Sequence, residues 1–299
     1  MELSINIGNL LTRCGLEKSV ELYKKGGFTA IDYSLGDMAK VEDSPFNGDG
    51  YREEAERIRK TVEDGGLIIN QTHTPFQFKH WDDEEYYKTV IYPRICRSIE
   101  ISALLGAKIA VVHPLHYLEF HGREEESFQT NMDFYRSLIP LCREYNIQIG
   151  IENMWRNDPR RRCVAHDTCS QKEEFVRYID TLDSEYMVAT LDIGHVGLPL
   201  QDDEAWDFIR ALGHDRLKSL HVHDNDYRSD AHSLPFLGKI NWDEVTKALG
   251  EINYDGDMTY EVGAGFVNNV PEGFLQNAVN YMGDVGHFLI SEIDRNRQM

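Results

Sequence analysis

The feature of this sequence that most constrains its fold is the alternation of short apolar segments with longer amphipathic segments. The apolar segments have the length of buried strands, and the longer segments repeat apolar residues at helical spacing. A helix between consecutive strands requires those strands to be parallel, because each connection must cross back over the sheet. The expected strands are Leu3–Ile7, Thr29–Ser34, Leu67–His73, Lys108–His113, Ile147–Asn153, Met187–Asp192, Leu217–Asp224 and Met258–Val262.

Eight strand–helix units follow one another without a linker rich in Pro, Gly or Ser. Eight units suit a closed barrel of about 250 residues, and the chain has 299 residues. We therefore predict the α/β class and a single (β/α)8 TIM barrel domain over residues 1–299, with one long helix bent near Pro93. The expected helices are Leu16–Lys25, Tyr51–Asp64, Glu84–Leu105, Glu124–Tyr145, Gln171–Leu182, Asp202–Leu212, Asn241–Leu249 and Pro271–Ile293.

The charge balance and the cysteine pattern argue against several classes of protein. Asp and Glu number 51 against 31 Lys and Arg, and the formal net charge of -20 opposes non-specific attraction to nucleic acid or an anionic membrane. The five cysteines are never spaced C-x-x-C, so neither a disulfide framework nor a zinc knuckle is indicated. The first residues lack the pattern of a signal peptide, and no stretch reaches about 18 apolar residues. We expect a cytoplasmic protein without membrane association and do not expect nucleic acid as its partner.

Acidic and imidazole side chains stand at or near the ends of six consecutive expected strands. The active face of a barrel lies at the C-terminal strand ends, where residues from distant parts of the sequence converge. Any one such residue alone is more often a hydrogen-bonded buried side chain. Six in consecutive strands indicate a shared site. These residues are His73, His113, Glu152, Asp192, His221 and Glu261.

Four of these residues form a candidate metal site: Glu152, Asp192, His221 and Glu261. Three carboxylates and one imidazole suit Mn, Mg, Co or Zn rather than a structural thiolate site. Three carboxylates crowded together would repel one another strongly without a cation. We therefore expect a divalent metal as the cofactor and no organic cofactor.

Seven short motifs together resemble those of the xylose-isomerase-like barrel superfamily, which contains sugar and sugar-phosphate isomerases and epimerases and also endonuclease IV. The resemblance covers essentially the whole chain. It is specific for the superfamily and not for one substrate. The motifs are HTPF (73–76), VVHP (111–114), IEN (151–153), LDIGH (191–195), LHVHDN (220–225), SDAHSLPFLGKINW (229–242) and YEV (260–262).

The ketose 3-epimerases of this superfamily imply one reading of the site. By resemblance the four residues above hold the metal, and Glu152 and Glu261 also act as acid and base around a metal-stabilised enediolate. This reading implies a small-molecule carbohydrate substrate, with His195 contacting a substrate oxygen. The epimerases' substrate-binding arginine beyond the histidine strand aligns with Tyr227, one residue short of Arg228, and by this resemblance we expect Arg228 to contact the substrate.

Endonuclease IV implies the alternative reading, a multinuclear zinc phosphodiesterase acting on abasic-site DNA. Its additional zinc ligands match five residues here, so all nine ligand positions are filled. His195 would then be a ligand and not a substrate contact. The strongly acidic balance argues against this alternative, and a barrel that binds sugar without turnover is a third class. The five residues are His73, His113, His195, Asp230 and His232.

Two further features are open to more than one reading. Arg156 begins a basic loop, 156–162, that could bind a sugar phosphate or a carboxylate or could be a solvated loop. Asp224 is expected to orient a ligating imidazole. The sequence leaves the oligomeric state open, a homo-oligomer included.

Overall fold

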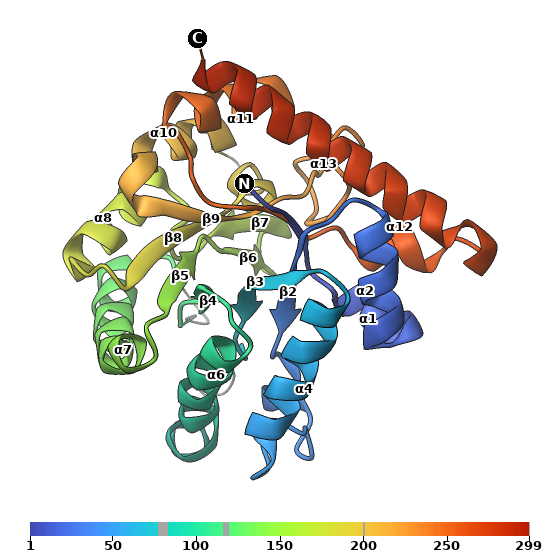
Figure 1. Ribbon diagram of the computed structural model, residues 1–299. Coiled ribbons are helices and arrows are strands. Elements are labelled where there is room, and N and C mark those ends of the chain that lie inside the picture. Colours follow the sequence, from blue (N-terminus) through green and yellow to red (C-terminus); the bar gives the residue numbers. More distant parts are fainter. Residues whose placement is uncertain (77–82, 116–119, 200, 299) are drawn as a thin grey trace.

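The computed structural model describes residues 1–76, 83–115, 120–199 and 201–298. In Figure 1, helices surround a curled sheet of parallel strands, of which six follow the spatial order β2-β3-β4-β5-β8-β9. These strands are β2 (Ala30–Ser34), β3 (Ile68–His73), β4 (Ile109–Val111), β5 (Gln148–Glu152), β8 (Met187–Asp192) and β9 (Leu217–His221).

Two more strands close the sheet into a barrel. Strand β1 (Leu3–Ile5) pairs in parallel with β10 (Met258–Tyr260). A single bridge between Asn6 and Asp32 joins this pair to β2, and a single bridge between Val222 and Tyr260 joins it to β9. The eight parallel strands fall within the eight expected segments, so the predicted (β/α)8 barrel is confirmed.

The helices cover the outside of the sheet, and the last of them, α13, packs against α2 and α11. None of the helices in the described residues is long and apolar enough to span a membrane. The main helices are α1 (Gly8–Cys14), α2 (Leu16–Lys25), α4 (Tyr51–Asp64), α6 (Tyr92–Leu104), α7 (Glu124–Tyr145), α8 (Lys172–Leu182), α10 (Ala205–Arg216), α11 (Trp242–Glu251) and α13 (Leu275–Arg297). The short ones are α3 (Asp37–Lys40), α5 (Glu84–Tyr86), α9 (Ile193–Val196), α12 (Ala264–Asn268) and the 3-10 turn η2 (Glu272–Phe274).

The long helix expected over residues 84–105 is interrupted near Pro93. A π-helical turn, η1 (Tyr87–Ile91), separates α5 from α6, and Pro93 lies in the first turn of α6. Proline has no N–H to donate and its ring crowds the preceding turn, so a widened turn just before it relieves both problems. The predicted bend is therefore present as a change of helix type.

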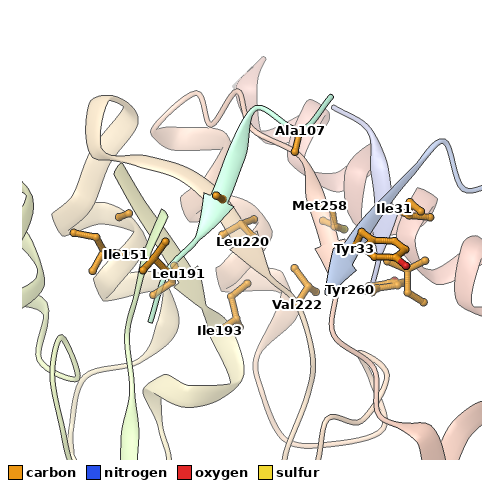
Figure 2. Packing of buried hydrophobic residues seen from close by; sticks show 14 of the residues in the cluster. Ile31, Tyr33, Ala107, Ile151, Leu191, Ile193, Leu220, Val222, Met258 and Tyr260 are labelled. Carbon is orange, nitrogen blue, oxygen red and sulfur yellow. The ribbon is translucent and has the colours of Figure 1, made fainter. Parts of the chain in front are cut away.

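Alternation along the strands separates the packed core from the candidate site. Ile151, Leu191 and Leu220 belong to the buried apolar cluster shown in Figure 2, and none of them is exposed. Successive side chains of a strand point to opposite faces. The next residues, Glu152 and Asp192, therefore point into the barrel, as does the residue after Leu220.

The basic loop expected at residues 156–162 is instead a two-stranded antiparallel hairpin, β6 (Trp155–Asp158) and β7 (Cys163–His166). The Asp158 carboxylate accepts hydrogen bonds from the backbone N–H groups of Arg160 and Arg161, each at 2.9 Å. An Asp that binds the N–H groups two and three residues later is a common turn former. The arginines at the tip are therefore presented by a hairpin turn that Asp158 holds.

Gly283 is a position where the packing of α13 has no room for a side chain. A Cβ atom there would collide with the carbonyl oxygen of Gly26, which follows α2. We expect Gly283→Ala to lower the free energy of unfolding by about 1–3 kcal/mol, because the two helices must move apart. Urea denaturation measures this change. Gly273→Ala is the control, since a Cβ there meets nothing within 4 Å; an equal loss in both variants would contradict the prediction.

Candidate metal centre

Four side chains at the ends of β5, β8, β9 and β10 form the primary group: Glu152, Asp192, His221 and Glu261. Each offers one ligand atom, and these atoms all lie within 4.8 Å of one another. Nδ1 of His221 lies 3.3 Å from Glu152 Oε1, 4.0 Å from Asp192 Oδ2 and 3.8 Å from Glu261 Oε2. Among the described residues neither ring nitrogen of His221 has a hydrogen-bond partner, although the ring is fully buried. A buried imidazole of this kind among carboxylates fits a metal ligand.

Two more histidines flank the glutamates of this group. Nε2 of His113 lies 3.0 Å from Glu152 Oε2, and Nε2 of His73 lies 3.0 Å from Glu261 Oε1. Each glutamate therefore turns one oxygen toward His221 and the other toward a flanking histidine. His73, His113 and Glu152 also form a ligand group of their own.

Asp32, which the sequence-based prediction did not include, contacts the Nδ1 side of the His73 ring, away from Glu261. Its Oδ2 lies 2.7 Å from His73 Nδ1 and accepts a hydrogen bond from Asn6 Nδ2 at 3.0 Å. A carboxylate beside Nδ1 favours a proton there and leaves Nε2 to face Glu261. The signal in the sequence was a charged residue in the middle of the apolar strand 29–34.

The IEN and LDIGH motifs are locked together by backbone contacts. Asn153 Oδ1 accepts from the Asp192 N–H at 2.7 Å, and Asn153 Nδ2 donates to the Asp192 carbonyl at 3.0 Å. Asp192 Oδ1 in turn accepts from the N–H of His195 at 2.8 Å and caps the short helix α9. This cap turns the chain so that His195 lies beside the primary group.

A further ligand group lies next to the primary one and contains three residues predicted as possible additional ligands: His195, Asp230 and His232. Its fourth member, His223, was not predicted as a ligand, although it belongs to the LHVHDN motif. Side chains two residues apart on a strand point to the same face. Alternation continued past the end of β9 at His221 would therefore direct His223 to the same side as His221, and this was the signal in the sequence that could have identified it.

Asp224 has a different role from the predicted one. Its fully buried carboxylate contacts no imidazole among its hydrogen-bond partners in the described chain. It accepts four hydrogen bonds and so closes the loop 225–240, which carries two of the ligands. The four donors are Asn225 N at 2.9 Å, Ile240 N at 3.1 Å, Phe236 N at 3.0 Å and Trp242 Nε1 at 2.9 Å.

A cavity of about 430 Å³ opens onto these groups. That size suits a small molecule. Lys40 is the one lysine or arginine among the described residues that line it. Arg156 and Arg228 are not among the described residues that line the cavity, whereas His195 is.

Charge pairing sets the ionisation of the cluster. Burial opposes the charge of Glu152, but the imidazoles of His221 and His113 lower its pKa well below the ordinary value. Burial also opposes the charged form of His232, yet the hydrogen bond to Asp230 helps to raise the pKa of that imidazole to about 9. Protons on the histidines thus hold the carboxylates together where no cation does, and a metal ion would displace those protons.

Comparison with known proteins gives a family and a fold. A family model described as xylose isomerase-like TIM barrel matches residues 20–277. In sequence, the uncharacterized protein y4fM from Sinorhizobium fredii is 24% identical over 273 residues, covering 83% of this chain and 81% of that protein. D-psicose 3-epimerase from Enterocloster bolteae is 21% identical over 244 residues, covering 79% of this chain and 72% of that enzyme.

Solved structures share the barrel. A D-tagatose 3-epimerase-like protein aligns with a TM-score of 0.74 at 20% identity over 99% of both chains. The IolI protein, whose crystal structure contains a zinc atom, aligns with a TM-score of 0.73 at 16% identity over 100% of both chains. At these identities the likeness establishes the fold.

The loop-closing role of Asp224 is testable through stability. We expect Asp224→Asn to lower the free energy of unfolding by about 2–6 kcal/mol, since two buried N–H donors lose an acceptor at about 1–3 kcal/mol each. Urea denaturation in the presence of a chelator measures this without a contribution from metal. Asp226→Asn is the matched control, because exposed Asp226 also accepts backbone N–H groups of this loop. A loss no larger than that of the control would refute the role.

Proposed function

Because this chain belongs to the xylose isomerase-like TIM barrel family, we propose that it is a divalent-metal-dependent isomerase or epimerase acting on a sugar or sugar phosphate. The observation that carries the proposal is the arrangement of Glu152 and Glu261, which approach His221 from β5 and β10. A pair of carboxylates on two sides of one ligand set suits proton removal and return.

The primary group fits a divalent ion in its donor chemistry, because three carboxylates and one buried imidazole without a hydrogen-bond partner lie together. When bound, the ion would supply the positive charge that polarises a substrate carbonyl and its neighbouring hydroxyl and so acidifies the C–H beside them. Residues Glu152, Asp192, His221 and Glu261 would hold it.

The glutamates supply the proton transfer. Glu152 Oε2 and Glu261 Oε1 face the flanking histidines and not His221, so each glutamate has an oxygen outside the primary group. One carboxylate removes the proton from the carbon beside the carbonyl. If the other returns a proton from the opposite face, the result is epimerisation, and return to the neighbouring carbon gives isomerisation.

The cavity supports a carbohydrate-sized substrate. Phe76 stacks on His113 with ring centroids 4.0 Å apart, and Trp155 stands edge-to-face against His195 at 6.3 Å. Aromatic faces of this kind pack against the C–H surface of a sugar ring. Lys40 offers a charge for a phosphate group. The epimerase relatives and the zinc-containing IolI structure also favour this function.

We expect Glu152→Gln and Glu261→Gln each to lower turnover by at least about 100-fold, because an amide cannot accept the proton. The measurement is NMR of free and phosphorylated ketoses incubated in D2O, with metal content determined in parallel. The parent should place solvent deuterium at the carbon that changes. Glu173→Gln is the control, since Glu173 is 76% exposed. Full turnover in both active-site variants, without deuterium in the product, would end this mechanism.

A second candidate is a multinuclear zinc phosphodiesterase acting on abasic-site DNA. The observation that favours it is that the described residues form four overlapping groups of candidate ligands, which suit more than one ion. Adjacent ions can stabilise both the attacking and the leaving oxygen of a phosphodiester. The net charge of -20 opposes it.

The two candidates differ in a direct assay. The phosphodiesterase predicts about three zinc ions per chain and incision of a duplex that contains one abasic site. Elemental analysis of the zinc-loaded protein and gel electrophoresis of the labelled duplex measure these quantities, with an undamaged duplex as control. Absence of incision by fully loaded protein would eliminate this candidate.

A further inference from the structure

His223 is a buried imidazole that the proposed reaction does not use. It follows β9 by two residues, and none of its surface is exposed. Its Nε2 lies 3.0 Å from Asp192 Oδ1 and 3.6 Å from Asp230 Oδ1. Its Nδ1 has no hydrogen-bond partner within the described part of the chain. A ring held in this way between two carboxylates needs a reason for its position.

The histidines beside it have a fixed orientation. His195 Nδ1 lies 2.8 Å from the carbonyl oxygen of Asn153, and His232 Nδ1 lies 2.6 Å from the carbonyl oxygen of Glu261. A carbonyl can only accept, so Nδ1 donates in both rings and Nε2 is the ligand nitrogen. These Nε2 atoms lie 3.5 Å and 3.2 Å from Asp230 Oδ2. A proton on each Nε2 satisfies this contact where no metal ion is bound, and a metal ion between the nitrogen and the carboxylate would take the place of that proton.

The distances from Asp230 to the three histidines are close to the ligand–ligand distances of tetrahedral coordination. A zinc ion with bonds of about 2.0–2.1 Å to its ligands has them about 3.3–3.4 Å apart in a tetrahedron. Asp230 Oδ2 lies 3.5 Å from Nε2 of His195 and 3.2 Å from Nε2 of His232, and Asp230 Oδ1 lies 3.6 Å from Nε2 of His223. All four ligand atoms lie within 4.8 Å of one another.

The chain around His223 leaves room for this ring. Gly194 lies against it, and a Cβ at that position would collide with three atoms of the imidazole. The ring also stacks on His232 at a centroid distance of 4.0 Å. The glycine of the LDIGH motif is therefore the residue that allows the histidine of the LHVHDN motif to reach the group.

We propose that His223 completes a closed zinc site with His195, Asp230 and His232, and that the ion in it fastens the loop 225–240 to the barrel and does not enter the reaction. Four protein ligands fill a tetrahedral zinc ion, and sites of this kind are structural, whereas catalytic sites keep a position open. The ligands come from the ends of β8 and β9 and from the loop itself. Binding there joins these segments, so loading the site stabilises the fold.

The competing reading is that His223 only donates a hydrogen bond to Asp192, a primary ligand. The two readings predict different effects of replacing His223 by Gln and of removing its side chain. A hydrogen-bond donor could be replaced by the amide of Gln, and its removal would weaken the primary group. A metal ligand cannot be replaced in this way, and its removal empties the neighbouring group.

The test counts zinc in the full-length protein in a background that lacks the primary histidine. We expect His221→Ala/His223→Ala and His221→Ala/His223→Gln each to bind one zinc ion fewer per chain than His221→Ala, by elemental analysis after dialysis. Their thermal unfolding on zinc loading should shift less than that of His221→Ala. His221→Ala/His214→Ala is the control, because His214 is 45% exposed and lies at the end of α10. Equal zinc counts in His221→Ala and both His223 variants would overturn the proposal, as would recovery by Gln.

Two measurements do not depend on a His223 variant that folds. Cobalt-loaded His221→Ala should show the strong visible absorption of four-coordinate cobalt, and a weak spectrum typical of six ligands would overturn the proposal. Gly194→Ala retains all four ligands but displaces the His223 ring, so we expect it to lose this cobalt signal and one zinc ion per chain. Retention of both would also overturn it.

Discussion

Charge balance between carboxylates and imidazoles is the interaction on which the mouth of this barrel, at the C-terminal ends of the strands, depends. Glu152 and Asp192 are buried, Glu261 is 15% exposed, and these three carboxylates lie close together where unpaired charges are costly. Each is offset by a histidine from a different strand or loop. Protons or metal ions can provide the balancing charge, but the carboxylates cannot be packed there without one of them. The protons or metal ions that balance these carboxylates therefore affect both the chemistry of the site and the stability of the fold.

Much of this could be predicted from sequence, because strand ends in a barrel are determined by a local pattern. The apolar runs before Glu152, Asp192 and His221 predict buried strands. The polar residue that follows each run must then lie at the end of the barrel where the C-terminal strand ends meet. The pairing of β1 with β10 follows from closure of the barrel. These inferences need only alternation and the count of strands.

The misses have a common physical cause, which is that they concern loops and partners from distant strands. Asp32 lies within an apolar strand, and only the position of His73 on the neighbouring strand shows why a charge is tolerated there. Asp224 looked like a partner for an imidazole, but the fold of the following loop brings four N–H groups to it instead. The space that admits the His223 ring depends on Gly194, which comes from a different segment. None of these distances is encoded by spacing along the chain.

The closure of the barrel has a consequence for how the molecule reaches its active form. Glu261 follows β10, and that strand is positioned by β1, with residue 3 paired to residue 258. Single bridges, together with backbone hydrogen bonds such as that from Thr29 N to Leu3 O, join the β1–β10 pair to the neighbouring strands. Pairing of residues so far apart in sequence has a high loop-closure entropy, which slows the folding of such topologies. The donor set is complete only once the two ends of the barrel have met, which makes metal affinity a reporter of barrel closure.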